Sequence, residues 1–147
     1  MNFPRIALAA VAAWLVSLPV GFLINDFLMA DIYAANRAVM RPEADVTANL
    51  PLGFVFVLVG FFAFAYAYAK GYEGGSGVME GVRFGVLVAL IVMGFGLIWQ
   101  YILYPITATM AAAMIVDSIV EFAIYGGVIG AIYRPAGTGV RQRAAAL

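Results

Sequence analysis

The sequence predicts an all-α membrane protein, a bundle of four transmembrane helices in a single domain. Of the 147 residues, 65% are hydrophobic and only 11% are charged, whereas a soluble domain has about 45–50% apolar and about 25% charged residues. A helix needs about 20 mostly apolar residues to cross the hydrocarbon core of a bilayer. The chain contains four such runs, which we place at residues 6–29, 51–69, 84–104 and 106–133.

The first run, residues 6–29, has two interpretations. A secretory signal peptide also combines a cation with an apolar stretch, but its apolar region covers only about 7–15 residues. This run is much longer, and no convincing cleavage site follows it. We therefore expect a retained transmembrane helix.

The second run, residues 51–69, contains a strict alternation from Phe62 to Tyr68, Phe-Ala-Phe-Ala-Tyr-Ala-Tyr. Alternation by itself is typical of a strand. A lone strand in hydrocarbon leaves its backbone N–H and C=O groups without partners, whereas a helix satisfies them internally. The run therefore predicts a helix, and Pro51 is expected to open it because proline fits the first turn of a helix.

The distribution of cations predicts how the chain is threaded. Cytoplasmic loops of membrane proteins carry an excess of Lys and Arg. Six cations fall on the side that both termini share, namely Arg5, Lys70, Arg83, Arg134, Arg141 and Arg143. The opposite side has only Arg37 and Arg41. We therefore expect both termini in the cytoplasm.

The longest connection, residues 30–50, is expected to begin with a short amphipathic helix on the outer side. Apolar residues recur there at helical spacing, at Leu28, Ile32, Ala35 and Val39. Pro42 is expected to end this helix. The segment either packs over the mouth of the bundle or forms a lid or a docking surface.

The end of the chain is expected to lie outside the bundle. Residues 1–134 form the predicted transmembrane domain, and residues 135–147 follow Pro135 as a segment rich in Gly and Ala. Such a composition is typical of a flexible segment, so we expect a flexible cytoplasmic tail.

Two carboxyl groups in the fourth run are the most informative polar residues. Asp117 and Glu121 lie four residues apart near its middle, so they share one helix face. A carboxylate at the bilayer centre costs about 3 kcal/mol on insertion scales, so both should point into the bundle. No Lys, Arg or His lies within the four predicted spans to neutralise them. We expect at least one to be protonated at neutral pH, or the pair to share a proton or a cation.

Other intramembrane polar residues extend this pair into a candidate binding seam. At about 1.5 Å per residue, Gln100 lies at the depth of Asp117, and Ser17 lies near the depth of Glu121. The alternative for each residue is an ordinary hydrogen bond to a neighbouring helix, or an interfacial position for Asp26. The seam is expected to open outward and to contain Asp117, Glu121, Gln100, Asn25, Asp26 and Ser17.

The composition also excludes several kinds of chemistry. The chain has no Cys, which removes disulfides, thiolate metal sites, iron–sulfur clusters and a cysteine nucleophile. It has no His, which removes His-ligated zinc and haem and a Ser-His-Asp triad. Two or three carboxylates are few for a tight metal site, and a net charge of zero does not suit nucleic acid. We therefore expect no cofactor, no metal and no nucleic-acid partner.

Small residues predict close helix packing. Gly81, Gly85 and Ala89 form a stripe entering the third span, and Gly126 and Gly130 form a Gly-x-x-x-Gly pair in the fourth. Such spacing lets helix backbones approach closely. On a helical wheel the Gly-x-x-x-Gly face lies about 180° from the carboxyl face. The fourth helix therefore either has a central position in the bundle or forms a homodimer through its glycine face.

Three segments give the chain a resemblance to a known group of proteins. They are Glu80-Gly-Val-Arg-Phe-Gly85, Val116-Asp117 and Gly126-Gly-Val-Ile-Gly-Ala-Ile-Tyr133. On these segments the chain resembles a group of small, uncharacterised bacterial integral membrane proteins with four spans. The resemblance covers roughly the C-terminal half and implies a four-span topology in a bacterial inner membrane, with no activity attached. Glu121 lies outside the shared pattern.

Three classes of function are compatible with these features. The most favoured is an accessory or scaffold component of a membrane assembly, in a homo-oligomer or a larger complex within the lipid bilayer. The alternative is a small proton- or cation-coupled carrier or binding site that uses Asp117 and Glu121. A membrane enzyme, or a quinone- or lipid-binding protein, is the least favoured, because no nucleophile–base pair can be identified in the sequence.

Overall fold

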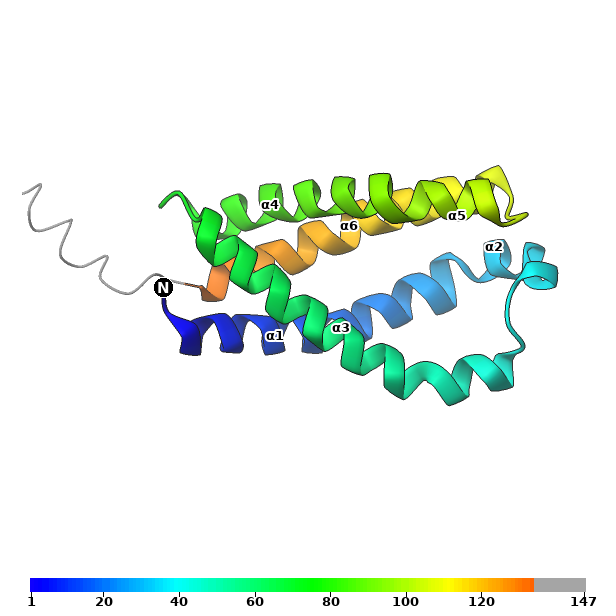
Figure 1. Cartoon of the computed structure of the whole chain (residues 1–147), viewed down its shortest axis with the longest axis horizontal. Helices are drawn as coiled ribbons and strands as arrows, with labels where there is room; N and C mark the ends of the chain where they lie inside the picture. Colours follow the sequence, from blue (N-terminus) through cyan, green and yellow to red (C-terminus); the bar gives the residue numbers. More distant parts are fainter. Residues whose placement is uncertain (134–147) are drawn as a thin grey trace, which may run out of the picture.

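A computed structural model describes residues 1–133 as a set of helices that run along one long axis (Figure 1). Within these residues there is no strand. Four helical segments are long and apolar enough to cross a membrane, and they span Phe3–Leu28, Glu43–Gly71, Gly77–Leu103 and Ala108–Ile132. The prediction of an all-α bundle with four spans is therefore confirmed, and the protein is of the multi-pass membrane type.

The first span consists of α1 (Phe3–Leu23) and a π-helical turn, η1 (Ile24–Leu28). The Asn2 side chain caps α1 by accepting a hydrogen bond from the backbone N–H of Arg5 at 3.3 Å. An asparagine is among the best residues at this position, because its side chain replaces a missing intrahelical acceptor. The span therefore begins close to the start of the chain, slightly earlier than the predicted residue 6.

The outer connection is shorter than predicted. The expected outer helix is present as α2 (Ala30–Ala35), followed by a 3-10 turn, η2 (Arg37–Val39). The chain is no longer helical at Pro42, as predicted, and α3 (Glu43–Gly71) starts directly after it. The outer helix is therefore a short segment between two spans.

The predicted role of Pro51 is wrong. This proline lies inside α3 rather than at its start. Glu43 and Asp45 lie in the first turn of α3, where negative side chains are stabilised by the helix dipole. Pro51 removes one backbone hydrogen bond to the preceding turn. This part of α3 is exposed, so neighbouring solvent or headgroups can satisfy the free carbonyl.

The third and fourth spans form a helical hairpin. The third span combines α4 (Gly77–Val92), a second π-helical turn, η3 (Met93–Leu97), and α5 (Ile98–Leu103). The fourth span is α6 (Ala108–Ile132). Thr107 caps α6 by accepting a hydrogen bond from the backbone N–H of Met110 at 3.2 Å.

Two ends of the bundle can be distinguished in Figure 1. We call the near end the one that holds the N-terminus, residues 72–76 and Tyr133, and the far end the one that holds residues 24–42 and 104–107. The chain thus leaves the described region at the end where it begins. The predicted tail, residues 135–147, and three of the counted cations, Arg134, Arg141 and Arg143, lie outside the described residues.

The fourth span has a central position, with different partners on different faces. One face of α6 packs against α4, and another packs against α1. A Cβ built on Gly81 would overlap the carbonyl oxygen of Gly126, and a Cβ built on Gly130 would overlap that of Gly77. The glycine face is therefore in backbone contact within the chain. Of the two alternatives for α6, the central position is the one observed, and this face is not free for a homodimer.

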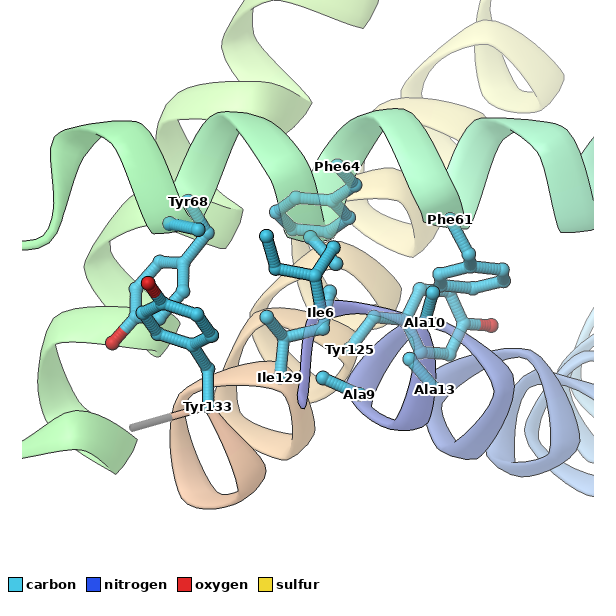
Figure 2. Packing of buried hydrophobic residues seen from close by; sticks show 12 residues of the cluster. Ile6, Ala9, Ala10, Ala13, Phe61, Phe64, Tyr68, Tyr125, Ile129 and Tyr133 are labelled. Atoms are coloured by element: carbon cyan, nitrogen blue, oxygen red, sulfur yellow. The ribbon is translucent and has the colours of Figure 1, made fainter. Parts of the chain in front are cut away.

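Aromatic and small residues from three spans form the buried core at the near end (Figure 2). Ala9, Ala10 and Ala13 are fully buried, so α1 approaches its neighbours closely. Phe61 of α3 packs edge-to-face on Tyr125 of α6, with ring centroids 5.1 Å apart. The other members of this core are Ile6, Phe64, Ala65, Tyr68, Ala69, Ile129 and Tyr133.

The far end is packed differently. The Trp14 indole N–H donates to the carbonyl oxygen of Phe54 at 3.2 Å, which links α1 to α3 near the middle of the bundle. Beyond this contact, every residue of α3 from Glu43 to Val57 is exposed, and in Figure 1 this half of the helix runs apart from the others. The far half therefore lacks the aromatic core that fills the near half.

Candidate functional site

The carboxyl group of Glu121 lies between α6 and α1. A Cβ built on Gly21 of α1 would stand 3.7 Å from Glu121 Oε1 and 3.9 Å from Asn25 Nδ2. The Glu121 carboxyl group therefore lies beside the α1 backbone at Gly21 and faces the bundle. Asn25 of η1 approaches the same residue of α1.

Asn25 is the centre of a small hydrogen-bonded chain at the end of the first span. Its Nδ2 donates to the carbonyl oxygen of Gly21 at 2.8 Å, and its Oδ1 accepts from the Tyr33 hydroxyl at 2.5 Å. Asn25 lies in the π-helical turn Ile24–Leu28, and π-helical turns occur often at functional sites. This chain fixes Tyr33 of α2 above the span.

Tyr33 lies close enough to the carboxyl groups to sense their charge. Burial raises the pKa of its phenol, and the negative charges of Asp117, Glu121 and Asp26 raise that pKa further. The phenol is therefore neutral at physiological pH and keeps its O–H as a hydrogen-bond donor. Tyr33 of α2 thus presents a neutral polar group within reach of the charge of both carboxyl groups.

Asp117 has an atom with an unusual environment. Its Oδ1 is buried and has no hydrogen-bond partner among the described residues. A buried acceptor without a partner costs about 1–3 kcal/mol, and more for a charged group. Ser118 Oγ is likewise buried without a partner. A proton on the carboxyl group, or a cation beside it, would reduce the cost of burying Asp117.

Tyr125 joins the carboxyl pair to the core. Its side chain is in hydrogen-bond contact with Glu121, while its ring packs on Phe61 and Phe122. Only 5% of Tyr125 is exposed. The boundary between the polar far half and the aromatic near half therefore lies between Glu121 and Tyr125, one helical turn apart.

Three residues of the predicted seam lie outside this group. The Ser17 hydroxyl donates to the carbonyl oxygen of Trp14 in its own helix at 2.7 Å. Asp26 is exposed. Gln100 is also exposed, and none of the described hydrogen bonds joins its side chain to the carboxyl pair. Depth in the membrane does not fix which way a side chain points, and the π-helical turn η3 before Gln100 alters the helical register.

Two residues near the carboxyl pair, Tyr33 and Tyr125, were not predicted from the sequence. Tyr125 lies four residues after Glu121, so the same spacing that paired the carboxyl groups could have included it. Tyr33 lies eight residues after Asn25, which is close to two helical turns, but the break at Met29 obscures this relation. Neither residue stands out from the composition or from the distribution of charge.

The site has few ligands for a metal ion. Within residues 1–133, no group of three or more Asp, Glu, His or Cys side chains is arranged to hold a metal ion. The neutral oxygen atom in contact with the pair is that of Tyr125, at Glu121. Such a set suits a proton or a singly charged cation better than a divalent ion, which usually takes more carboxylate oxygens.

Comparisons with protein-family models, with curated proteins and with solved structures find no match to this chain. The class of protein follows from the fold itself. It is an α-helical multi-pass membrane protein with four candidate spans. Two carboxyl side chains, Asp117 and Glu121, lie within the last of them.

Proposed function

We propose that this protein binds and exchanges a proton or a small singly charged cation at Asp117 and Glu121, as a small carrier or an ion-coupled membrane component. The observation that supports this most directly is the buried Asp117 Oδ1, which has no hydrogen-bond partner among the described residues. Ionisable side chains inside a membrane are rare, face the bundle interior and often mark ion or proton pathways. This one retains capacity to bind.

The charge around the pair supports the same proposal. The salt bridge found in the described part of the chain joins Arg37 to Glu43 at 3.5 Å, and both side chains are largely exposed. It lies in the outer connection, away from the carboxyl pair. Because two adjacent carboxylates repel each other, a bound proton or cation is the remaining source of compensation.

The proposed location is a bacterial inner membrane with the near end in the cytoplasm. Arg5, Lys70 and Arg83 lie in segments of the near end, and Arg134 follows Tyr133 directly in the sequence. Arg37 and Arg41 are the cations of the far end. Positive residues concentrate on the cytoplasmic side of membrane proteins, so the carboxyl pair would be reached from the outside.

The test is the infrared carboxyl band of the purified protein in lipid. The band is assigned with Asp117→Asn and Glu121→Gln, and then followed while the pH is raised or a single salt is added. We expect the band to disappear through the neutral pH range or on addition of one cation, because an exchangeable site must release its proton. Asp26→Asn is the matched control, since this exposed carboxyl group lies close to the site.

A band that is present but unaffected by pH and by every salt would contradict the proposal. It would mean that the pair is permanently protonated and hydrogen-bonded. The scaffold function would then be favoured, since the pair would serve only to hold α6 against α1.

An accessory role in a membrane assembly is the second candidate, and the exposed far half of α3 supports it. Phe56 is 67% exposed and Leu52 is 58% exposed, and neither belongs to the buried core. We expect Phe56→Ala to dissociate an assembly without unfolding the chain if this face binds a partner. The mass of the particle extracted in native nanodiscs provides the measurement, and an unchanged mass would count against this role.

A further inference from the structure

The short helix α2 lies across the far end of the bundle, between the first span and the start of α6 (Figure 1). It follows the π-helical turn directly, with Met29 as the connecting residue. Met29 is buried, and its sulfur accepts a hydrogen bond from the Tyr33 hydroxyl at 3.7 Å. The inner side of α2 is therefore anchored over the end of the first span.

A second contact fixes α2 to the opposite hairpin. Asn36 is only 4% exposed, although it belongs to a polar connection. Its Nδ2 donates to the Ile32 carbonyl oxygen at 2.8 Å and to Thr107 Oγ1 at 3.2 Å. Its Oδ1 accepts from the backbone N–H of Thr107 at 2.9 Å. We call this set of hydrogen bonds the Asn36–Thr107 latch.

We propose that Tyr33 is a third member of the carboxyl site and that α2 is a lid, held closed by the Asn36–Thr107 latch, which controls access to Asp117 and Glu121 from the far end. This inference rests on the proposed function. It adds the residue that completes the site and the contact that regulates its opening.

The chemistry of the lid fits this role. A neutral phenol can donate a hydrogen bond to a carboxylate or accept one from a protonated carboxyl group, so Tyr33 is compatible with both states of the pair. Its acceptor, Asn25, has its amide nitrogen next to Gly21, the same residue that the Glu121 carboxyl group approaches. In the proposed lid, passage of an ion from the far end requires α2 to move away.

The latch is suited to be the closing contact because it joins segments 71 residues apart in the sequence. Opening the lid would break these hydrogen bonds and leave polar groups of Asn36 and Thr107 without partners. This cost favours the closed state. The hinge is Met29, where the helical path changes from the π-helical turn to α2. The lid can therefore open without disturbing the α4–α6 contact.

The experiment uses the absence of native cysteine in the chain. In the double variant Asn36→Cys/Thr107→Cys, a disulfide holds α2 to the start of α6 when the protein is oxidised, and no link remains when it is reduced. Formation of the disulfide is verified by mass, and a short thiol cross-linker joins the two cysteines if the disulfide does not form. The readout is the rate at which the protonated carboxyl band shifts after transfer of the protein in lipid to D2O.

We expect the carboxyl proton to exchange about tenfold faster in the reduced variant than in the oxidised variant. A factor of about ten corresponds to the loss of two buried hydrogen bonds. The single variant Asn36→Cys, treated with the same oxidant, should exchange at the fast rate under both conditions. Equal rates for the linked and unlinked double variant would overturn the lid.

Membership of Tyr33 in the site has a separate test. Tyr33→Phe keeps the ring and removes only the hydroxyl group, so the fold should be retained. We expect the proton or cation concentration at which the carboxyl band disappears to change at least about threefold, or about half a pH unit, as for loss of one hydrogen bond. Tyr101→Phe, at an exposed tyrosine of α5, is the matched control. No change in Tyr33→Phe would remove Tyr33 from the site.

The carboxyl site and its lid can be tested separately. If the carboxyl band of the wild-type protein ignores pH and salt, the proposed function is wrong. If the wild-type band responds but the latch and Tyr33 variants behave like the wild type, the site is real and the lid is wrong.

Discussion

The near half and the far half of the bundle are built from different interactions. In the near half, Ala9, Ala10 and Ala13 are fully buried and the rings of Phe61, Phe64, Tyr68 and Tyr125 fill the space between the helices. In the far half, the contacts are hydrogen bonds from Asn25, Tyr33 and Asn36, and the facing part of α3 is exposed. The helices are thus closely packed at the near end, whereas at the far end polar contacts join the first span, α2 and the start of α6, and α3 stands apart.

This difference separates the closely packed part of the molecule from the part that carries the proposed site. Close backbone contact and ring packing are short-range and leave little freedom of movement. Hydrogen bonds between polar side chains can exchange partners at small cost. A protein that must admit an ion can therefore change at its far half while its near half keeps the helices together.

The largest expected effect is at the α4–α6 contact of the near half. Gly81→Ala should destabilise the fold by about 3 kcal/mol or more, because the new methyl group would overlap the backbone carbonyl of Gly126, which cannot move aside like a side chain. The measurement is unfolding of the protein in mixed micelles by sodium dodecyl sulfate. Gly60→Ala is the matched control, since a Cβ there meets nothing within 4 Å, and it should not destabilise the protein. Equal effects of the two substitutions would contradict the close contact.

The next largest effect is expected in the aromatic core. Ile129 has no exposed surface and packs within the near-half core. Ile129→Ala should reduce the free energy of unfolding by about 3 kcal/mol, the usual cost of a cavity left by a large aliphatic side chain. The exposed residue Ile102 provides the control, because Ile102→Ala removes the same atoms from a surface that is 61% exposed. A similar loss at both positions would argue against a specific near-half core.

A smaller and local effect is expected at the latch. Asn36→Ala should reduce stability by about 2 kcal/mol, because Thr107 and Ile32 lose side-chain partners. Hydrogen exchange of the backbone should rise in α2 and in the first turn of α6 while the near half is unchanged. An increase spread over all four spans would mean that the two halves unfold as one unit.

The smallest effect on stability is expected at the carboxyl pair. Asp117→Asn should raise the free energy of unfolding by about 1 kcal/mol, because it removes a carboxyl group buried without a partner beside a second carboxyl group. Unfolding by sodium dodecyl sulfate at neutral pH gives the value, and Asp26→Asn, at an exposed position, should change little. A loss of stability in Asp117→Asn would mean that this carboxyl group makes a favourable structural contact.

Part of the candidate site could be predicted from local spacing. Asp117 and Glu121 fall on one face because they are four residues apart, and Gly126 and Gly130 fall on another for the same reason. Gln100 could not be assigned in this way. Its depth matched that of Asp117, but its direction depends on η3, a π-helical turn that sequence periodicity does not mark.

The outer connection shows the same limit. Apolar spacing predicted a helix before Pro42, and the structure has α2 and η2 there. The spacing could not predict that Asn36 is buried, since its partners at Thr107 come from a distant part of the chain. The position of Pro51 inside α3 was also not predicted. Proline favours the start of a helix, but the acidic residues at Glu43 favour an earlier start, and spacing alone does not show which preference prevails.

The sequence by itself determined the class of protein, the number of spans, and the faces on which the carboxyl and glycine residues lie. These follow from hydrophobic length and from the 3.6-residue period, which are local properties of the chain. Only the tertiary structure decided that α4 occupies the glycine face of α6 and that Asn36 of the outer connection is bonded to Thr107 at the start of α6. Those contacts join residues far apart in sequence, and their geometry depends on helix packing and on two π-helical turns that change the register.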